Sequence, residues 1–224
     1  MVPPIEKSLK LSSTKKVFWV ALFSVAMAYF EAAVVVYLRA IFYPNGFDFP
    51  LAMGPDSIII TELGREAATI LMLVTIGFLC GRSKPERFAY LLISFGIWDI
   101  MYYVWLKVLI GWPSSLLTWD ILFLIPLPWV GPCLAPILVS IAMIWAGWWI
   151  VRCHDRGFVP QFPVWAWFGE IAAGLIIIVS FIWDFNNIVS GGYPDVFRWD
   201  IFLIGMIAGI GLFLFMIKKQ SMRY

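Results

Sequence analysis

The sequence predicts an all-α integral membrane protein with six membrane-spanning helices. Of its 224 residues, 62% are hydrophobic and only 13% are charged, whereas about a quarter of the residues in a soluble domain are charged. Six apolar segments each reach about 20 residues, the length that crosses a bilayer as a helix. The Lys and Arg residues also gather in alternate connections between these segments, as they do in multi-pass membrane proteins.

The spans follow one another through short polar or proline-rich connections. We expect helices over about residues 17–43, 56–80, 88–110, 131–151, 164–189 and 198–217. Pro44, Pro50 and Pro55 separate the first two spans, because proline lacks a backbone donor and ends helices. Residues 17–217 are thus predicted to form one six-helix transmembrane domain, with a polar cytoplasmic tail at 1–16 and a basic cytoplasmic tail at 218–224.

The basic residues predict the orientation in the membrane. Twelve of the 16 Lys and Arg residues fall on one side, in the two tails and in the loops at 81–87 and 152–163. The opposite loops have essentially none. Because cytoplasmic loops carry the excess of Lys and Arg, both termini are expected in the cytoplasm, and the chain is expected to be a multi-pass protein of the cell membrane.

The remaining charges are predicted to concentrate in the outer half of the membrane, where acids exceed bases. The inner half of the spans has few charges, mainly Glu170. Charged residues inside a membrane are rare, face the protein interior and often mark functional sites. The four outer bases are Arg39, Arg65, Lys107 and Arg198, and the seven outer acids are Glu31, Glu62, Glu66, Asp99, Asp120, Asp184 and Asp200.

The second span contains the densest group of charges. Glu62, Arg65, Glu66 and Thr69 are spaced i, i+3, i+4 and i+7, so they form one stripe on a helix. One interpretation is a buried ion-pair network that fixes helix packing. The other is a carboxylate pair that binds a cation, relays protons or acts as general acid and base.

The first and third spans add further candidates for a ligand-binding or ion-coupling site. Glu31 and Arg39 are two turns apart and out of register, so each is expected to contact a neighbouring helix. Asp99, Tyr103 and Lys107 are spaced i, i+4 and i+8 on the third span. Lys107 is expected either to pair with Glu62 or Glu66, or to extend to the membrane interface.

A Trp-Asp pair recurs four times in a pattern that suggests repeated hairpins. Each of two copies has an acid on the outgoing helix, an aromatic-Pro turn and an acid on the returning segment. A weaker third copy joins Glu31 to Glu62, so three helical-hairpin repeats are one interpretation, and coincidence of interfacial aromatic-Pro turns is the other. The four pairs are 98–99, 119–120, 183–184 and 199–200.

The connection at 111–130 is apolar and has no Lys or Arg. Four prolines within residues 126–136 exclude a regular helix there. The connection is predicted to lie in the interface or to dip back into the protein. Residues 119–125 are expected to form a lid or short interfacial helix near the outer charges, with an amphipathic surface helix favoured over a re-entrant loop.

No metal or cofactor site is evident. Asp184, Asn186 and Asn187 precede a glycine turn, where such side chains usually cap and reverse the chain. Together with Asp200 they suit a hard cation as the alternative, but no dedicated ion motif is present. The single histidine excludes an internally bis-His-ligated haem. Nothing in the sequence supports nucleic-acid binding.

Three functions fit these patterns, and no residue is assigned a catalytic role. The leading hypothesis is binding or transport of a small polar solute, with a cationic one favoured by the excess of acids. The first alternative is a membrane enzyme that uses carboxylates as acid and base on a lipid or isoprenoid. The second is a non-catalytic subunit of a larger complex. The expected partners are the lipid bilayer, a small polar or amphipathic ligand and, for the second alternative, other membrane subunits.

Overall fold

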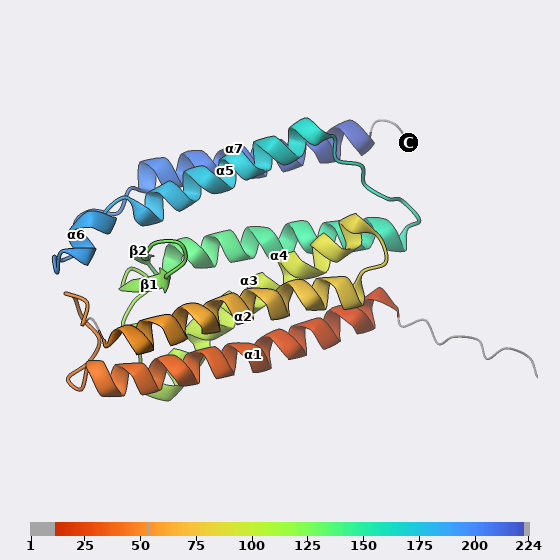
Figure 1. Cartoon of the computed structure of the whole chain (residues 1–224). Helices are drawn as coiled ribbons and strands as arrows, with labels where there is room; N and C mark the ends of the chain where they lie inside the picture. Colours follow the sequence, from red (N-terminus) through yellow and green to blue (C-terminus); the bar gives the residue numbers. More distant parts are fainter. Residues whose placement is uncertain (1–11, 53, 222–224) are drawn as a thin grey trace, which may run out of the picture.

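The computed structural model describes residues 12–52 and 54–221, and it is mostly helical, at 72%. Within these residues, six helices are long and apolar enough to cross a membrane, which confirms the predicted number of candidate spans. They run side by side along one direction (Figure 1). Their bounds are α1 Ser13–Phe42, α2 Asp56–Cys80, α3 Lys84–Ile110, α4 Leu134–Asp155, α5 Val164–Ile182 and α7 Trp199–Ser221.

Serine caps extend two helices beyond their predicted starts. The Ser12 hydroxyl accepts a hydrogen bond from the Lys15 N–H and caps α1. The Ser83 hydroxyl accepts one from the Glu86 N–H and caps α3. The cap of α1 makes residues 13–16 of the predicted N-terminal tail helical. At the other end of the chain, α7 continues through residues 218–221 of the predicted C-terminal tail. The remaining tail residues, 1–11 and 222–224, lie outside the described residues.

The predicted continuous fifth span over 164–189 is wrong. α5 ends at Ile182, and a separate short helix, α6, covers Phe185–Val189. The Asp184 carboxylate accepts hydrogen bonds from the Asn187 side chain at 3.2 Å and from the Asp195 N–H at 3.0 Å. These bonds hold the chain in a turn, because Asp and Asn side chains compete with the helical hydrogen bonds of the backbone.

The predicted helix at 119–125 is also wrong. Residues Trp119–Phe123 form strand β1, which pairs antiparallel with β2, Trp129–Pro132. Aromatic and β-branched side chains favour extended backbone. Pro126 and Pro128 lie in the turn between the strands, where no ladder donor is needed. The connection is therefore a hairpin packed at one end of the helices (Figure 1).

The helices form two units. In the first, α3 is central and contacts α1, α2 and α4. A Cβ on Gly147 would lie 2.6 Å from the Ala89 carbonyl oxygen, and one on Gly96 would lie 2.6 Å from that of Ser140. Glycine at both positions thus allows α3 and α4 to approach closely. In the second unit, α5 packs against α7, and this pair contacts the rest mainly through α4 and β2.

The two Trp-Asp copies occupy different local structures. In the first copy, Asp99 lies within α3 and Asp120 lies in a strand. In the second, Asp184 follows the end of α5 and Asp200 starts α7. α1 also packs more extensively on α3 than on α2. The sequence similarity therefore does not correspond to matching pairs of helices.

The connections divide between the two ends of the bundle (Figure 1). At one end lie the start of α1, the end of α7 and the α2–α3 and α4–α5 connections. At the other end lie the α1–α2 connection, the β1–β2 hairpin and α6. This second end is called the hairpin end below, and most of the predicted site residues lie in its half of the molecule.

Candidate functional site

Arg65 joins α1 to α2 at the centre of a charged cluster. Its guanidinium pairs through Nη1 with Glu31 Oε1 and through Nε with Glu62 Oε2, the latter at 2.7 Å. The Thr69 hydroxyl donates to Glu31 Oε2 at 3.2 Å. The predicted stripe on the second span therefore faces α1 and surrounds its glutamate. All three charged side chains are at most 20% exposed.

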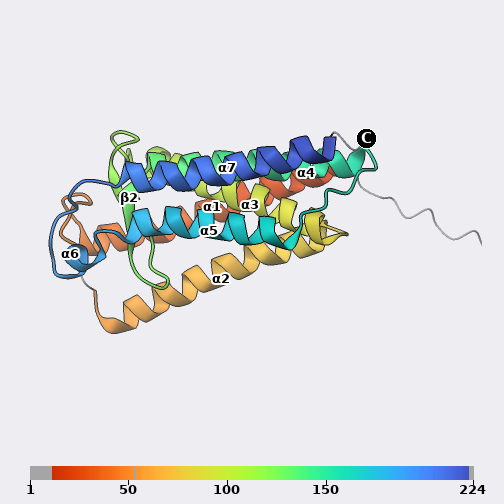
Figure 2. The same cartoon turned by 90° about the horizontal axis from the view of Figure 1, so that it is seen from above.

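Glu66 extends this cluster to the hairpin. Its Oε1 lies 4.0 Å from Arg65 Nη2. Its two carboxylate oxygens accept the Leu124 N–H at 3.0 and 2.9 Å. Leu124 directly follows β1, and the turn of the hairpin reaches toward α2 (Figure 2). No sequence pattern predicts this contact, because the donor is a backbone group 58 residues away.

Arg39 and Asp120 form a second, more deeply buried pair. Arg39 Nη2 lies 2.9 Å from Asp120 Oδ1, and the two residues are 8% and 1% exposed. The guanidinium also lies over two rings, at 3.7 Å from the Trp112 centroid and 4.4 Å from that of Phe47. Arg39 thus connects α1 to β1 and to two connections that sequence spacing did not relate to it.

Tyrosines of α3 lie between the charged groups. Tyr103 lies one helical turn after Asp99, and its ring centroid lies 6.5 Å from that of Trp112, the ring under the Arg39 guanidinium. Asp99 itself accepts a hydrogen bond from the Ser140 hydroxyl of α4 at 2.8 Å. The ring of the neighbouring Tyr102 packs edge-on against that of Tyr103, with the ring centroids 5.0 Å apart. Eight predicted residues lie in or beside this polar region, which is named the outer site below after their predicted place in the membrane: Glu31, Arg39, Glu62, Arg65, Glu66, Asp99, Tyr103 and Asp120.

The other three predicted residues lie outside this region. Lys107 donates to the carbonyl oxygens of Gly111 at 3.0 Å and Pro113 at 2.9 Å, and no ion pair among the described residues joins it to a glutamate. Asp184 holds the turn before α6. Asp200 pairs with Arg198 at 2.6 Å on an exposed surface. Each of these side chains forms its hydrogen bonds or ion pair with groups close to it in the chain.

Because the pKa of the Asp120 carboxyl differs between the folded and unfolded chain, we expect the stability of the protein to depend on pH. Burial raises its pKa from the ordinary 3.8 to about 7, while Arg39 acts in the opposite direction. Between these values the folded protein retains a proton that the unfolded chain has lost. The contribution of this group to stability is therefore full below about pH 4 and falls as the pH rises to about 7.

Melting temperatures between pH 4 and pH 8 check this expectation. The Asp120→Asn variant should show a flatter dependence than the wild type, because it removes one titrating group. Identical slopes for the two proteins would contradict the assignment of the titration to Asp120.

The acids of the outer site are not arranged as a metal centre. Within residues 12–52 and 54–221, no group of three or more His, Cys, Asp or Glu side chains is placed to hold a metal ion. The carboxylates instead contact guanidinium, hydroxyl and backbone N–H groups. No protein-family model, curated protein or solved structure matches this chain.

Proposed function

We propose that this protein binds a small organic cation at the outer site and moves it across the membrane. The observation that carries the proposal is the imbalance of charge. Among the described residues of the site, five carboxyl groups surround two guanidinium groups. The acids are Glu31, Glu62, Glu66, Asp99 and Asp120, and the bases are Arg39 and Arg65.

An excess of acids in a low-dielectric region requires compensation. An unpaired buried carboxylate either takes up a proton or pairs with a cation, because its charge is poorly solvated there. Asp99 has a hydroxyl as its hydrogen-bond donor and pairs with no base of the described residues. The rings of Tyr102, Tyr103 and Trp112 lie in the same region and suit an ammonium group. These features support an organic cation, with protons as its competitor.

The proposed orientation places the hairpin end outside the cell. Support comes from the Lys and Arg residues at the opposite end of the bundle, including Arg82, Lys84, Arg152 and Arg156. Cytoplasmic segments of multi-pass proteins carry such an excess. With this orientation both termini are cytoplasmic, and the outer site faces the extracytoplasmic solution in the cell membrane.

The test measures binding of ammonium ions to the purified protein in lipid nanodiscs. The probes are ethylammonium, trimethylammonium and tetraethylammonium, with propionate and propanol as the anionic and neutral controls. We expect at least one ammonium ion to bind, and to bind at least tenfold more weakly, about 1.4 kcal/mol, to the variants Glu66→Gln and Asp99→Asn. Glu66→Gln keeps an oxygen that accepts the Leu124 N–H, so its fold is retained.

The matched control is Asp200→Asn, which removes an exposed acid outside the site. Its affinity for the ammonium ion should equal that of the wild type. Absence of binding for all three ions, or equal affinities in all variants, overturns the proposal. In that case a lower melting temperature of Glu66→Gln identifies the network as a purely structural element, as expected for a non-catalytic subunit.

Transport is measured as uptake into proteoliposomes that contain the same variants. Uptake of the bound ammonium ion should be lost in Asp99→Asn and kept in Asp200→Asn. Binding without any uptake in the wild type would restrict the function to binding and remove transport from the proposal.

A further inference from the structure

A cavity of about 340 Å³ lies between the two helix units, among α3, α4, α5 and α7. It is separate from the outer site, and no residue of that site lines it. Its walls are apolar and rich in aromatic and methionine side chains, including Met143, Trp145, Met206 and Phe213. Aliphatic side chains such as Leu92 and Ile177 complete the lining. Of the described residues that line it, Glu170 is the one charged residue.

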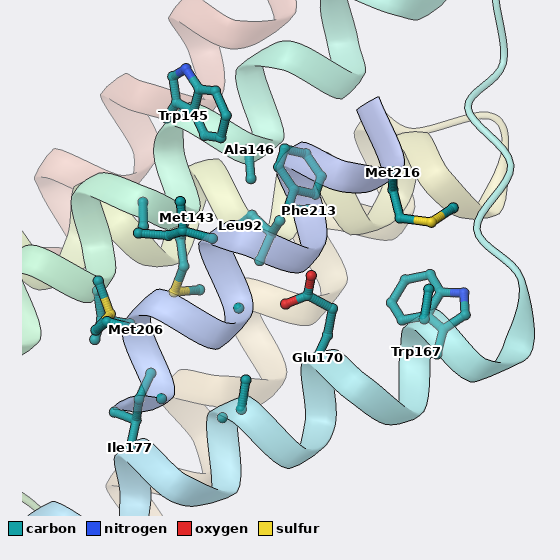
Figure 3. Close-up of a pocket in the computed structure, with 18 of the residues that line it drawn as sticks. Leu92, Met143, Trp145, Ala146, Trp167, Glu170, Ile177, Met206, Phe213 and Met216 are labelled. Carbon is teal, nitrogen blue, oxygen red and sulfur yellow. The ribbon is translucent and has the colours of Figure 1, made fainter. Parts of the chain in front are cut away.

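The Glu170 carboxylate points from α5 into this cavity (Figure 3). It is the seventh residue of α5, within the predicted inner half of the membrane. It makes no hydrogen bond or ion pair with the described residues. Such a group in apolar surroundings is costly, and a bound donor or cation would compensate it.

Small residues create the space beside the carboxylate. A Cβ on Gly209 would lie 3.4 Å from Glu170 Oε2 and 3.5 Å from the Ala173 Cβ. Gly174 and Gly205 also line the cavity. The absence of side chains at these positions leaves room for another molecule next to Glu170. The volume falls at the lower end of the roughly 300–1,000 Å³ typical of small-molecule sites.

The lining selects the chemistry of the occupant. The apolar walls suit a hydrocarbon body, and the carboxylate suits one cationic group. Trp145, Trp167 and Phe213 also line the cavity, and aromatic rings attract ammonium ions. A second carboxylate close to Glu170 would be repelled. We propose that this cavity binds a hydrophobic amine, whose ammonium group pairs with Glu170 while its apolar body fills the space between the two helix units.

This proposal is independent of the outer site, and its test uses different probes. Binding of radiolabelled dodecylamine to the protein in phosphatidylcholine nanodiscs is compared with that of dodecanol and dodecanoate, which share the chain and differ in the head group. We expect dodecylamine to bind at least tenfold more tightly than either. An added arm contains phosphatidylethanolamine, and displacement of dodecylamine there would identify an aminolipid as the source of the ammonium group.

Three variants complete the experiment. Glu170→Gln should weaken dodecylamine binding at least tenfold with an unchanged melting temperature, because Glu170 has no partner in the described structure. Gly209→Leu should abolish binding by filling the cavity. Its matched control is Gly211→Leu, at a position with nothing within 4 Å, which should bind like the wild type.

Two results would overturn the proposal. The first is equal affinity for dodecylamine and dodecanol, which would make the cavity an apolar gap without charge recognition. The second is unchanged amine binding by Glu170→Gln. If Gly209→Leu fails to fold, the head-group comparison and Glu170→Gln still decide the outcome.

Discussion

Arg65→Met is expected to lower the free energy of unfolding by about 3–5 kcal/mol, the cost of removing one partner of a buried ion pair. The guanidinium contacts Glu31, Glu62 and Glu66 from the centre of their cluster. Its loss leaves three acids close together with no base between α1 and α2. Methionine keeps much of the side-chain volume, so the expected loss reports charge and hydrogen bonding rather than a cavity.

Reversible unfolding in mixed micelles with increasing dodecyl sulfate measures this change. The combined variant Arg65→Met with Glu31→Gln and Glu62→Gln should recover part of the lost stability, because it removes two of the stranded charges. Lys107→Met is the control, since Lys107 donates to carbonyl groups beside its own helix and should change stability by less than about 1 kcal/mol. Equal stabilities for Arg65→Met and Lys107→Met would show that the cluster contributes little to the fold.

Arg39→Met is expected to be comparably destabilising, by about 3–5 kcal/mol. Asp120 would lose its cation while 1% exposed, and the rings of Phe47 and Trp112 would lose the planar group that lies over both. Arg39→Lys should recover only part of the loss, because an ammonium group cannot reproduce the planar stacking of a guanidinium.

The same unfolding titration measures the Arg39 variants, and limited proteolysis within residues 111–133 adds a local readout. Because Arg39 fixes β1 to α1, cleavage of the hairpin should be faster in Arg39→Met. The control is Arg198→Met, whose ion pair with Asp200 is exposed and should contribute little to stability. Unchanged proteolysis of the hairpin in Arg39→Met would contradict its anchoring by this pair.

Segment length and hydropathy predicted the long helices well, and local side-chain chemistry explains the errors. The start of α1 depends on the Ser12 hydroxyl, and the end of α5 on the hydrogen bonds of Asp184. The sequence predicts a lid or short interfacial helix at 119–125, because periodicity cannot separate a strand from a helix in so few residues. Its identity as a strand depends on pairing with residues 129–132.

The candidate site was partly predictable, because helical spacing relates residues that share one helix face. Glu62, Arg65 and Glu66 share one helix face, and helical spacing relates them directly. The partners Leu124 and Trp112 come from connections far along the chain, where no periodic signal relates them to an arginine or glutamate. The sequence predicts Glu170 as the main charge of the inner half, but the cavity around it is formed by four helices and has no sequence signature.

The division into two helix units has a consequence for assembly during synthesis. Every ion pair and hydrogen bond described for the outer site joins residues between Glu31 and Ser140. All of these residues precede the end of α4. The nascent chain can therefore complete the charge pairing of the outer site before α5 leaves the ribosome, and the last two helices join helices whose buried charges already have their partners.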